Sequence, residues 1–149
     1  MADSAVLARL AGYLYWPDAL RKAQAGSSQA DRFHVLLMNG ALPEVRGAIA
    51  DRPELLADLL PIIANPEASI NVRLGASVIF EEQAGGPALR ALVGRLVELA
   101  AHADARVRAD ACFYLGLSGA AEARTCLQAR VQDQDAEVRE IAIDALAAL

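Results

Sequence analysis

Residues 104–111 read Asp104-Ala105-Arg106-Val107-Arg108-Ala109-Asp110-Ala111, and a similar stretch, Asp135-Ala136-Glu137-Val138-Arg139, begins thirty-one residues later. In both copies Asp, Ala, Val and Arg occupy the same places, and a leucine follows at Leu115 and Leu146. A period of about 30 residues is typical of stacked helical hairpins, because each hairpin is one structural unit. This register predicts the fold.

The composition supports the same interpretation. Hydrophobic residues make up 55% of the 149-residue chain but aromatic residues only 5%, and the remainder is largely Ala and Leu, which favour helices. A chain of this length fits a single domain with its own core. We expect residues 1–149 to form one all-α domain, with divergent helices over 1–64 and clear repeats over 65–149.

The formal net charge is −5, from 19 acidic and 14 basic residues. Nucleic-acid binding uses a basic field that displaces counterions from phosphates, so this charge makes a nucleic-acid partner unexpected. No run of about 18 apolar residues lacks a charge, so no membrane span is expected, and no signal peptide is evident. We expect a soluble cytoplasmic protein whose two cysteines remain thiols.

Turn residues divide the chain into helices. Asn39-Gly40 ends a helix that carries Phe33 and Leu37, and Pro17, Pro43, Pro53 and Pro87 are all suited to a first helical turn. Further helices are expected over about 6–15, 17–25, 43–50, 53–64, 71–83, 87–101, 105–118, 120–132 and 136–149. The leucines and isoleucines of 53–64 are too many for a surface helix, so we expect that helix to be buried on more than one side.

The repeated residues have structural roles that physical chemistry explains. Asp104 and Asp135 stand where an N-cap is needed. A third copy begins at Val72-Arg73, with Ser69 in place of the aspartate. The repeat valines are expected to face the hairpin partner and the repeat alanines to let helices approach. We expect Arg108 and Arg139 to reach the acidic loop of the preceding unit.

On these residues the chain resembles the HEAT-repeat family, in particular its short bacterial form, the HEAT-like or phycobilisome-lyase-type repeats. The resemblance implies a right-handed α-solenoid of antiparallel helical hairpins, with about eight or nine helices. It also implies a non-catalytic scaffold that binds a protein or peptide partner on a curved surface formed by the second helix of each unit.

The resemblance leaves other functions open. Some such repeats assist bilin lyases and others act on alkylated DNA bases, although no tetrapyrrole pocket is marked here and the net charge opposes a DNA substrate. On the second helices, the residues expected to face a partner are Arg90, Arg95, Glu98, Arg124 and Gln128. Tyr15 and Trp16 either cover the exposed end of the array or anchor a partner.

Cys112 and Cys126 lie seven residues on either side of Gly119, so an antiparallel hairpin that turns there places them at a similar level along its axis. Packing as small apolar side chains is the favoured interpretation; a redox or metal role, as in a redox adaptor, and a structural disulfide are the alternatives. His34 and His102 are isolated and form no metal or triad pattern. We expect no catalytic residues, metal or cofactor; the sequence does not define the partner or the oligomeric state.

Overall fold

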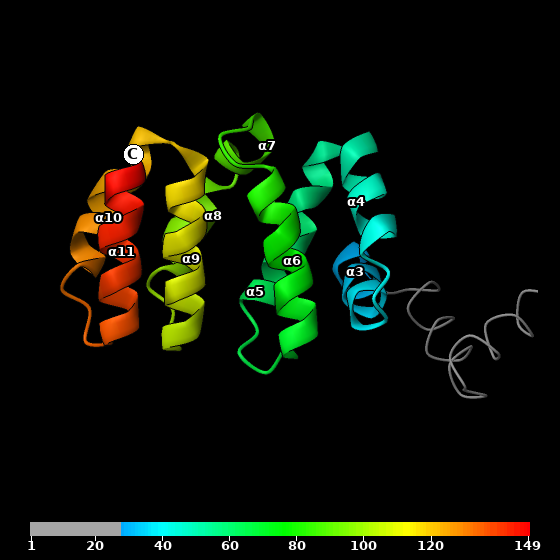
Figure 1. Ribbon diagram of the computed structural model, residues 1–149, viewed down its shortest axis with the longest axis horizontal. Coiled ribbons are helices and arrows are strands. Elements are labelled where there is room, and N and C mark those ends of the chain that lie inside the picture. The colour runs from blue at the N-terminus through cyan, green and yellow to red at the C-terminus, as the bar shows by residue number, and fades with distance from the viewer. Residues whose placement is uncertain (1–27) are drawn as a thin grey trace, which may run out of the picture.

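The computed structural model describes residues 28–149, and every regular element in that range is helical. The nine α-helices and two 3-10 helices of these residues form a row of antiparallel hairpins, with α3 (Gln29–Met38) at one end and the C-terminus at the other (Figure 1). The expected all-α solenoid of helical hairpins is confirmed. The first helices of the hairpins are α4 (Leu42–Asp51), α6 (Ile70–Glu82), α9 (Ala105–Ser118) and α11 (Ala136–Ala148).

The first helices begin where their capping residues predict. Asp104 Oδ1 accepts hydrogen bonds from two backbone N–H groups in the first turn of α9, at 2.8 and 3.3 Å, and Asp135 Oδ1 does the same in α11, at 2.9 and 3.1 Å. Ser69 caps α6 in place of an aspartate, its hydroxyl accepting from the Val72 N–H at 3.4 Å. Each such cap stabilises its helix by about 1 kcal/mol. Gly119, at a φ of 64°, ends α9 in the left-handed conformation that glycine favours.

The second helices are broken, which corrects the expectation of continuous helices over 53–64, 87–101 and 120–132. Two of them begin with a 3-10 helix and continue as a short α-helix: η1 (Pro53–Leu59) with α5 (Leu60–Ile63), and η2 (Ala121–Ala123) with α10 (Arg124–Arg130). In the third, a tight turn joins two α-helices, α7 (Pro87–Arg90) and α8 (Val93–Leu99). The turn from α7 to α8 is closed by a hydrogen bond from the Leu92 N–H to the Leu89 carbonyl, at 3.0 Å.

Apolar residues three apart explain these tight segments. Leu56 and Leu59 are both buried, and the same spacing recurs in the pairs Leu89/Leu92 and Ala120/Ala123. Residues three apart eclipse each other in a 3-10 turn but lie about 60° apart in an α-helix. The tighter winding therefore turns both members of each pair toward the first helices.

The core lies between the layers of first and second helices. The repeat valines Val72, Val107 and Val138 are all 0% exposed, as the repeat predicts. The repeat alanines are also 0% exposed: Ala76, Ala111 and Ala142. The leucines and isoleucines of 53–64 are buried apart from the partly buried Leu55, so the expectation of burial on several sides is confirmed.

First helices are spaced unevenly along the row. α9 packs directly on α11, where a Cβ atom on Gly116 would lie only 2.7 Å from the Ala145 Cβ atom. α6 faces α9 through larger groups: Phe80 stacks on Tyr114 with ring centroids 4.4 Å apart, and Arg73 forms an ion pair with Asp110. Because bulky side chains separate α6 from α9, this pair leaves a groove at the surface.

An arginine–aspartate pair joins the last two units. Arg108 donates from Nε and Nη2 to the two carboxylate oxygens of Asp133, at 3.0 and 2.9 Å, and both side chains are buried. Asp133 lies in the loop before α11, so the carboxylate that Arg108 pairs with belongs to the following loop and not to the preceding one. Arg139 does reach the loop before its own helix, where it donates to the Asp133 carbonyl at 2.8 Å.

The direction of this pairing has a local cause. Arg108 Nη1 donates to the carbonyls of His102 and Ala103, at 3.0 and 2.9 Å, and these contacts hold the guanidinium at the N-terminal end of α9. The Arg108 guanidinium in turn holds the pKa of Asp133 below its usual range. The repeated arginine therefore ties one interhelical loop to the next.

Candidate partner-binding surface

The five residues expected to face a partner are exposed and lie on the second helices. Arg90 belongs to α7, Arg95 and Glu98 to α8, and Arg124 and Gln128 to α10. They do not form a single cluster, because two separate grooves divide the surface and Arg124 and Gln128 line neither of them. Tyr15 and Trp16 lie outside the described residues.

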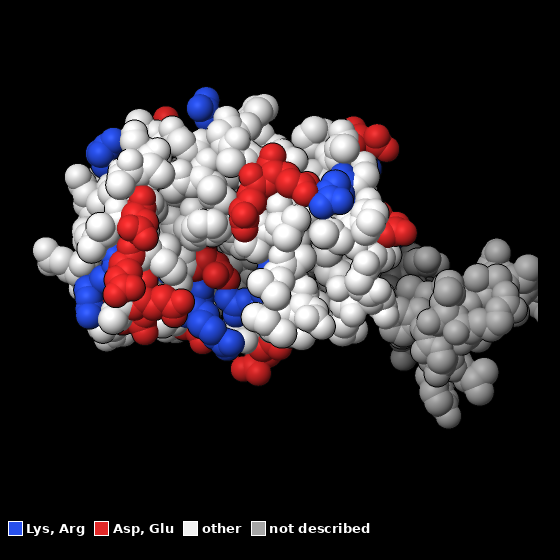
Figure 2. Space-filling view, viewed as in Figure 1, with Lys and Arg blue, Asp and Glu red and all other residues white. Residues whose placement is uncertain are grey.

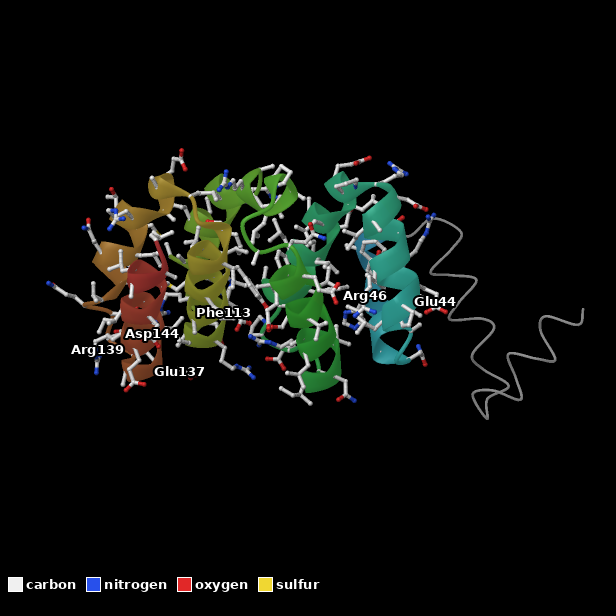
Figure 3. The ribbon with its side chains drawn as sticks, turned by 45° about the horizontal axis from the view of Figure 1, so that its top comes forward. Glu44, Arg46, Phe113, Glu137, Arg139 and Asp144 are labelled. Carbon is white, nitrogen blue, oxygen red and sulfur yellow. The ribbon has the colours of Figure 1, made fainter. Side chains whose placement is uncertain are left out.

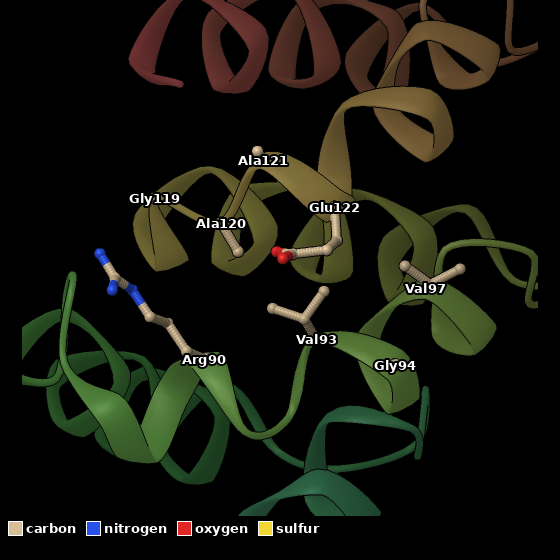
Figure 4. Close-up of a pocket in the computed structure, with 8 residues that line it drawn as sticks. All are labelled: Arg90, Val93, Gly94, Val97, Gly119, Ala120, Ala121 and Glu122. Carbon is tan, nitrogen blue, oxygen red and sulfur yellow. The ribbon is translucent and has the colours of Figure 1, made fainter.

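The larger groove, of about 620 Å³, separates α7 and α8 from the turn that follows α9. Figure 4 shows Arg90 on one side of it and the Glu122 carboxylate directed over Val93 toward its middle. Arg90 Nε donates to the Ser118 carbonyl at 3.3 Å, so the guanidinium is anchored at the rim. Val93 and Val97, four residues apart on α8, supply an apolar floor.

The sequence did not single out this groove, although signals for it exist. Gly94 has nothing within 4 Å of the position a Cβ atom would take, so the surface of α8 is open at that point. Gly119 ends α9 and lets the chain turn toward η2, which brings Glu122 over α8. Small residues beside a helix end therefore mark where the groove opens.

A smaller groove of about 170 Å³ lies between α5 and α8. Arg95 and Glu98 line it together with Leu60, Pro61 and Leu99. Both grooves occupy the spaces between successive second helices, and each combines one arginine and one glutamate with apolar side chains. This arrangement suits a protein segment that places apolar side chains between the helices and polar groups at the rim.

The two cysteines are free thiols, and Cys112 is 0% exposed. Burial raises the pKa of the Cys112 thiol to about 12, and the neighbouring Cys126 adds to the rise. Burial also raises the pKa of the half-buried Cys126. A raised pKa suppresses the thiolate, which is the reactive species, so the geometry favours packing over a redox role.

The remaining candidate groups have structural contacts. His102 Nδ1 accepts a hydrogen bond from the Asp104 N–H at 2.9 Å and so orders the loop before α9. Within residues 28–149, no group of three or more His, Cys, Asp or Glu side chains could hold a metal ion. None of the helices described is both long and apolar enough to cross a membrane.

Comparison with known proteins supports the repeat interpretation. Residues 93–149, from α8 to the end of α11, match the family model described as HEAT repeats. The match supports a HEAT-repeat family for this part of the chain, and HEAT repeats generally mediate protein–protein interaction or scaffolding. No curated protein and no solved structure matches the chain.

Proposed function

We propose that this protein is a non-catalytic scaffold that binds a protein or peptide partner on the surface of its second helices. The supporting observation is the pair of grooves between successive second helices, each with apolar residues below an arginine and a glutamate. We further propose that it acts in the cytoplasm, where two free thiols would stay reduced.

The grooves suit a peptide for two physical reasons. Val93, Val97, Leu60 and Leu99 can remove apolar side chains of a partner from water, which is the main source of binding free energy. Charges of both signs at the rims select a partner with complementary charges and set its orientation. No residue arrangement in this surface supports a covalent or proton-transfer step.

Charge reversal tests this proposal. We expect Arg90→Glu with Arg95→Glu to abolish co-purification of the partner from the native host, while Arg106→Glu with Arg46→Glu, on the first helices, retains it. Both double variants change the net charge equally, so a difference between them reports on the surface and not on total charge. Equal recovery of the partner with both double variants would show that the second helices are not the binding surface.

Arg124→Glu, measured separately, defines how far the surface extends. Arg124 is exposed on α10 but lines neither groove. A loss of binding would show that the partner continues past Glu122 onto α10. Unchanged binding would confine the contact to α5, α7, α8 and η2, which line the two grooves.

A further inference from the structure

The first helices carry a surface groove of their own, on the other side of the core from the proposed partner surface. One hollow, of about 380 Å³, lies where α6 faces α9, and a second, of about 180 Å³, lies between α9 and α11. Phe113 and Ile141 line both hollows, so the two adjoin and form one channel, the first-helix groove. Phe113 is 39% exposed and Ile141 is half-buried, which makes the middle of the groove apolar.

The walls at both ends of the groove also carry apolar surface. In the larger hollow, Leu74 of α6 forms part of the wall and is 57% exposed. Small residues line the smaller hollow and leave room for a side chain from outside: Gly116, Ala145 and Ala148. Contiguous exposed apolar surface of this kind is a mark of protein-interaction sites.

An acidic strip borders the groove along α11. Glu137, Glu140 and Asp144 are exposed and three or four residues apart, so they lie on one face of that helix. Glu137 lines the larger hollow and Asp144 the smaller one, and Figure 3 shows these two residues on α11 and Phe113 on the neighbouring α9. Figure 2 shows the strip beside a largely uncharged region. Within residues 28–149 these three carboxylates take part in no ion pair.

The arginines of the larger hollow already have partners. Arg73 forms an ion pair with Asp110, and its Nη1, which has no acceptor within residues 28–149, is buried and out of reach of a ligand. Arg106 Nη2 donates to the Pro66 carbonyl at 2.7 Å, and its Nε lies 3.9 Å from Asp104 Oδ1. The unmatched charge along the groove is therefore negative. The formal net charge of the chain is −5, so its long-range field also attracts a cationic partner.

We propose that the first-helix groove binds a basic amphipathic helix of a partner protein, at a site separate from the second helices. From Glu137 to Ala148, α11 rises about 16 Å at 1.5 Å per residue, which matches about three turns of a bound helix. The apolar side chains of that helix enter the two hollows on either side of Phe113, and its lysines or arginines lie along the acidic strip. Apolar burial supplies the affinity of such a helix in a groove, and charge sets its orientation.

A second copy of this chain is a poorer occupant. The exposed large apolar side chains of residues 28–149 lie on α3, α6, α9 and α11, and each of these helices has at most one exposed arginine and no lysine. No described helix of a second copy therefore combines an apolar face with a row of positive charges. Nucleic acid and an anionic membrane are opposed by the acidic strip, which repels phosphate groups.

Fluorescence anisotropy with two labelled peptides tests the proposal on the full-length chain. One peptide, of about 18 residues to favour helix formation, carries leucines at i, i+3, i+4 and i+7 on one face and lysines on its flanks; the other has glutamates in place of the lysines. We expect the basic peptide to bind at least about tenfold more tightly than the acidic one. Its affinity should fall as the salt concentration is raised, because salt screens exposed charges.

Charge variants locate the site. We expect Glu137→Lys with Asp144→Lys to weaken binding of the basic peptide at least about tenfold, since the strip then repels the lysines. Glu98→Lys with Glu122→Lys changes the net charge equally but lies at the grooves between second helices, and should leave binding unchanged. The reverse result would place the peptide on the second helices and overturn the proposal.

Apolar variants separate binding in the groove from attraction between charges alone. Phe113→Ser should weaken binding of the basic peptide at least about fivefold, because the lost ring no longer covers apolar side chains of the peptide. Ile143→Ser should not weaken it, because Ile143 is 52% exposed on α11 but lines neither hollow. Circular dichroism establishes that each variant is folded.

Three results would overturn the proposal. The first is no binding of the basic peptide, or equal affinity for the basic and acidic peptides. The second is equal affinity of the native chain and Phe113→Ser for the basic peptide. The third is self-association of the chain that Glu137→Lys with Asp144→Lys abolishes, since the groove would then hold a second copy.

Discussion

The buried pair of Arg108 and Asp133 should contribute more to stability than any other ion pair among the described residues. Its side chains are 6% and 3% exposed, and the guanidinium contacts both carboxylate oxygens. Asp133→Ala would leave the Arg108 charge buried without its carboxylate. Removal of one member of such a pair costs about 3–5 kcal/mol, since the remaining charge is neither solvated nor paired.

Arg46 provides a matched control with similar geometry at the surface. It lies on the outer face of α4 (Figure 3) and donates from Nε and Nη2 to Glu82, at 3.0 and 2.7 Å, but its side chain is 45% exposed. Water can replace the lost contacts there, so Arg46→Ala should cost about 0–1 kcal/mol. Asp133 also accepts from Arg130 and from the Asp135 N–H, at 3.1 and 2.9 Å, so the difference between the two variants reports burial together with these contacts.

Urea unfolding of the full chain, followed by circular dichroism at 222 nm, measures both free energies. The slope of the unfolding free energy against urea concentration should be the same in all variants. A reduced slope in Asp133→Ala would indicate that the last hairpin unfolds separately. In a double-mutant cycle with Arg108→Met, the two substitutions should cost about 1–3 kcal/mol less together than the sum of the single changes. The reasoning is refuted if Asp133→Ala costs no more than Arg46→Ala.

Four further predictions concern packing, helix propensity, pH and thiol reactivity. Gly116→Val should destabilise the protein by about 1–3 kcal/mol because even a Cβ atom there would lie 2.7 Å from a side chain of α11. Gly94→Ala should stabilise it by about 0.4–1 kcal/mol in the same urea assay, since its Cβ position is open. The lowered pKa of Asp133 adds stability above its unfolded pKa of about 3.9, and this contribution is lost as pH falls through the lower folded pKa. The unfolding free energy of the native protein should therefore fall more on acidification than the unfolding free energy of the Asp133→Ala variant does. With its pKa raised to about 12, Cys112 should resist a thiol reagent at pH 8 until the protein unfolds, and rapid labelling of the folded protein would contradict its burial.

The first helices could be predicted because their signals are local. Asp104 and Asp135 cap α9 and α11 through backbone groups within three residues, so the caps are visible in the sequence. The breaks in the second helices are less visible, because the pair Leu89/Leu92 fits an α-helix as readily as a 3-10 turn. Only burial against the first helices distinguishes the two windings.

Contacts between units could not be predicted from the repeat. Arg108 pairs with Asp133 because of how one loop lies against the next, and that placement is not encoded within either copy alone. The groove between α6 and α9 likewise depends on Tyr114, a bulky residue at the position that Ala145 occupies in the following copy. Differences between copies therefore determine the surface, whereas the shared residues determine the fold.

Chemical-shift mapping of the isotopically labelled chain with its purified partner tests the proposed function most directly. The amides that shift should be those of Val93, Val97 and Glu122, followed by those around Arg95 and Glu98. These residues line the two grooves between second helices. Shifts confined to α6 and α9, with the second helices unchanged, would contradict the proposal.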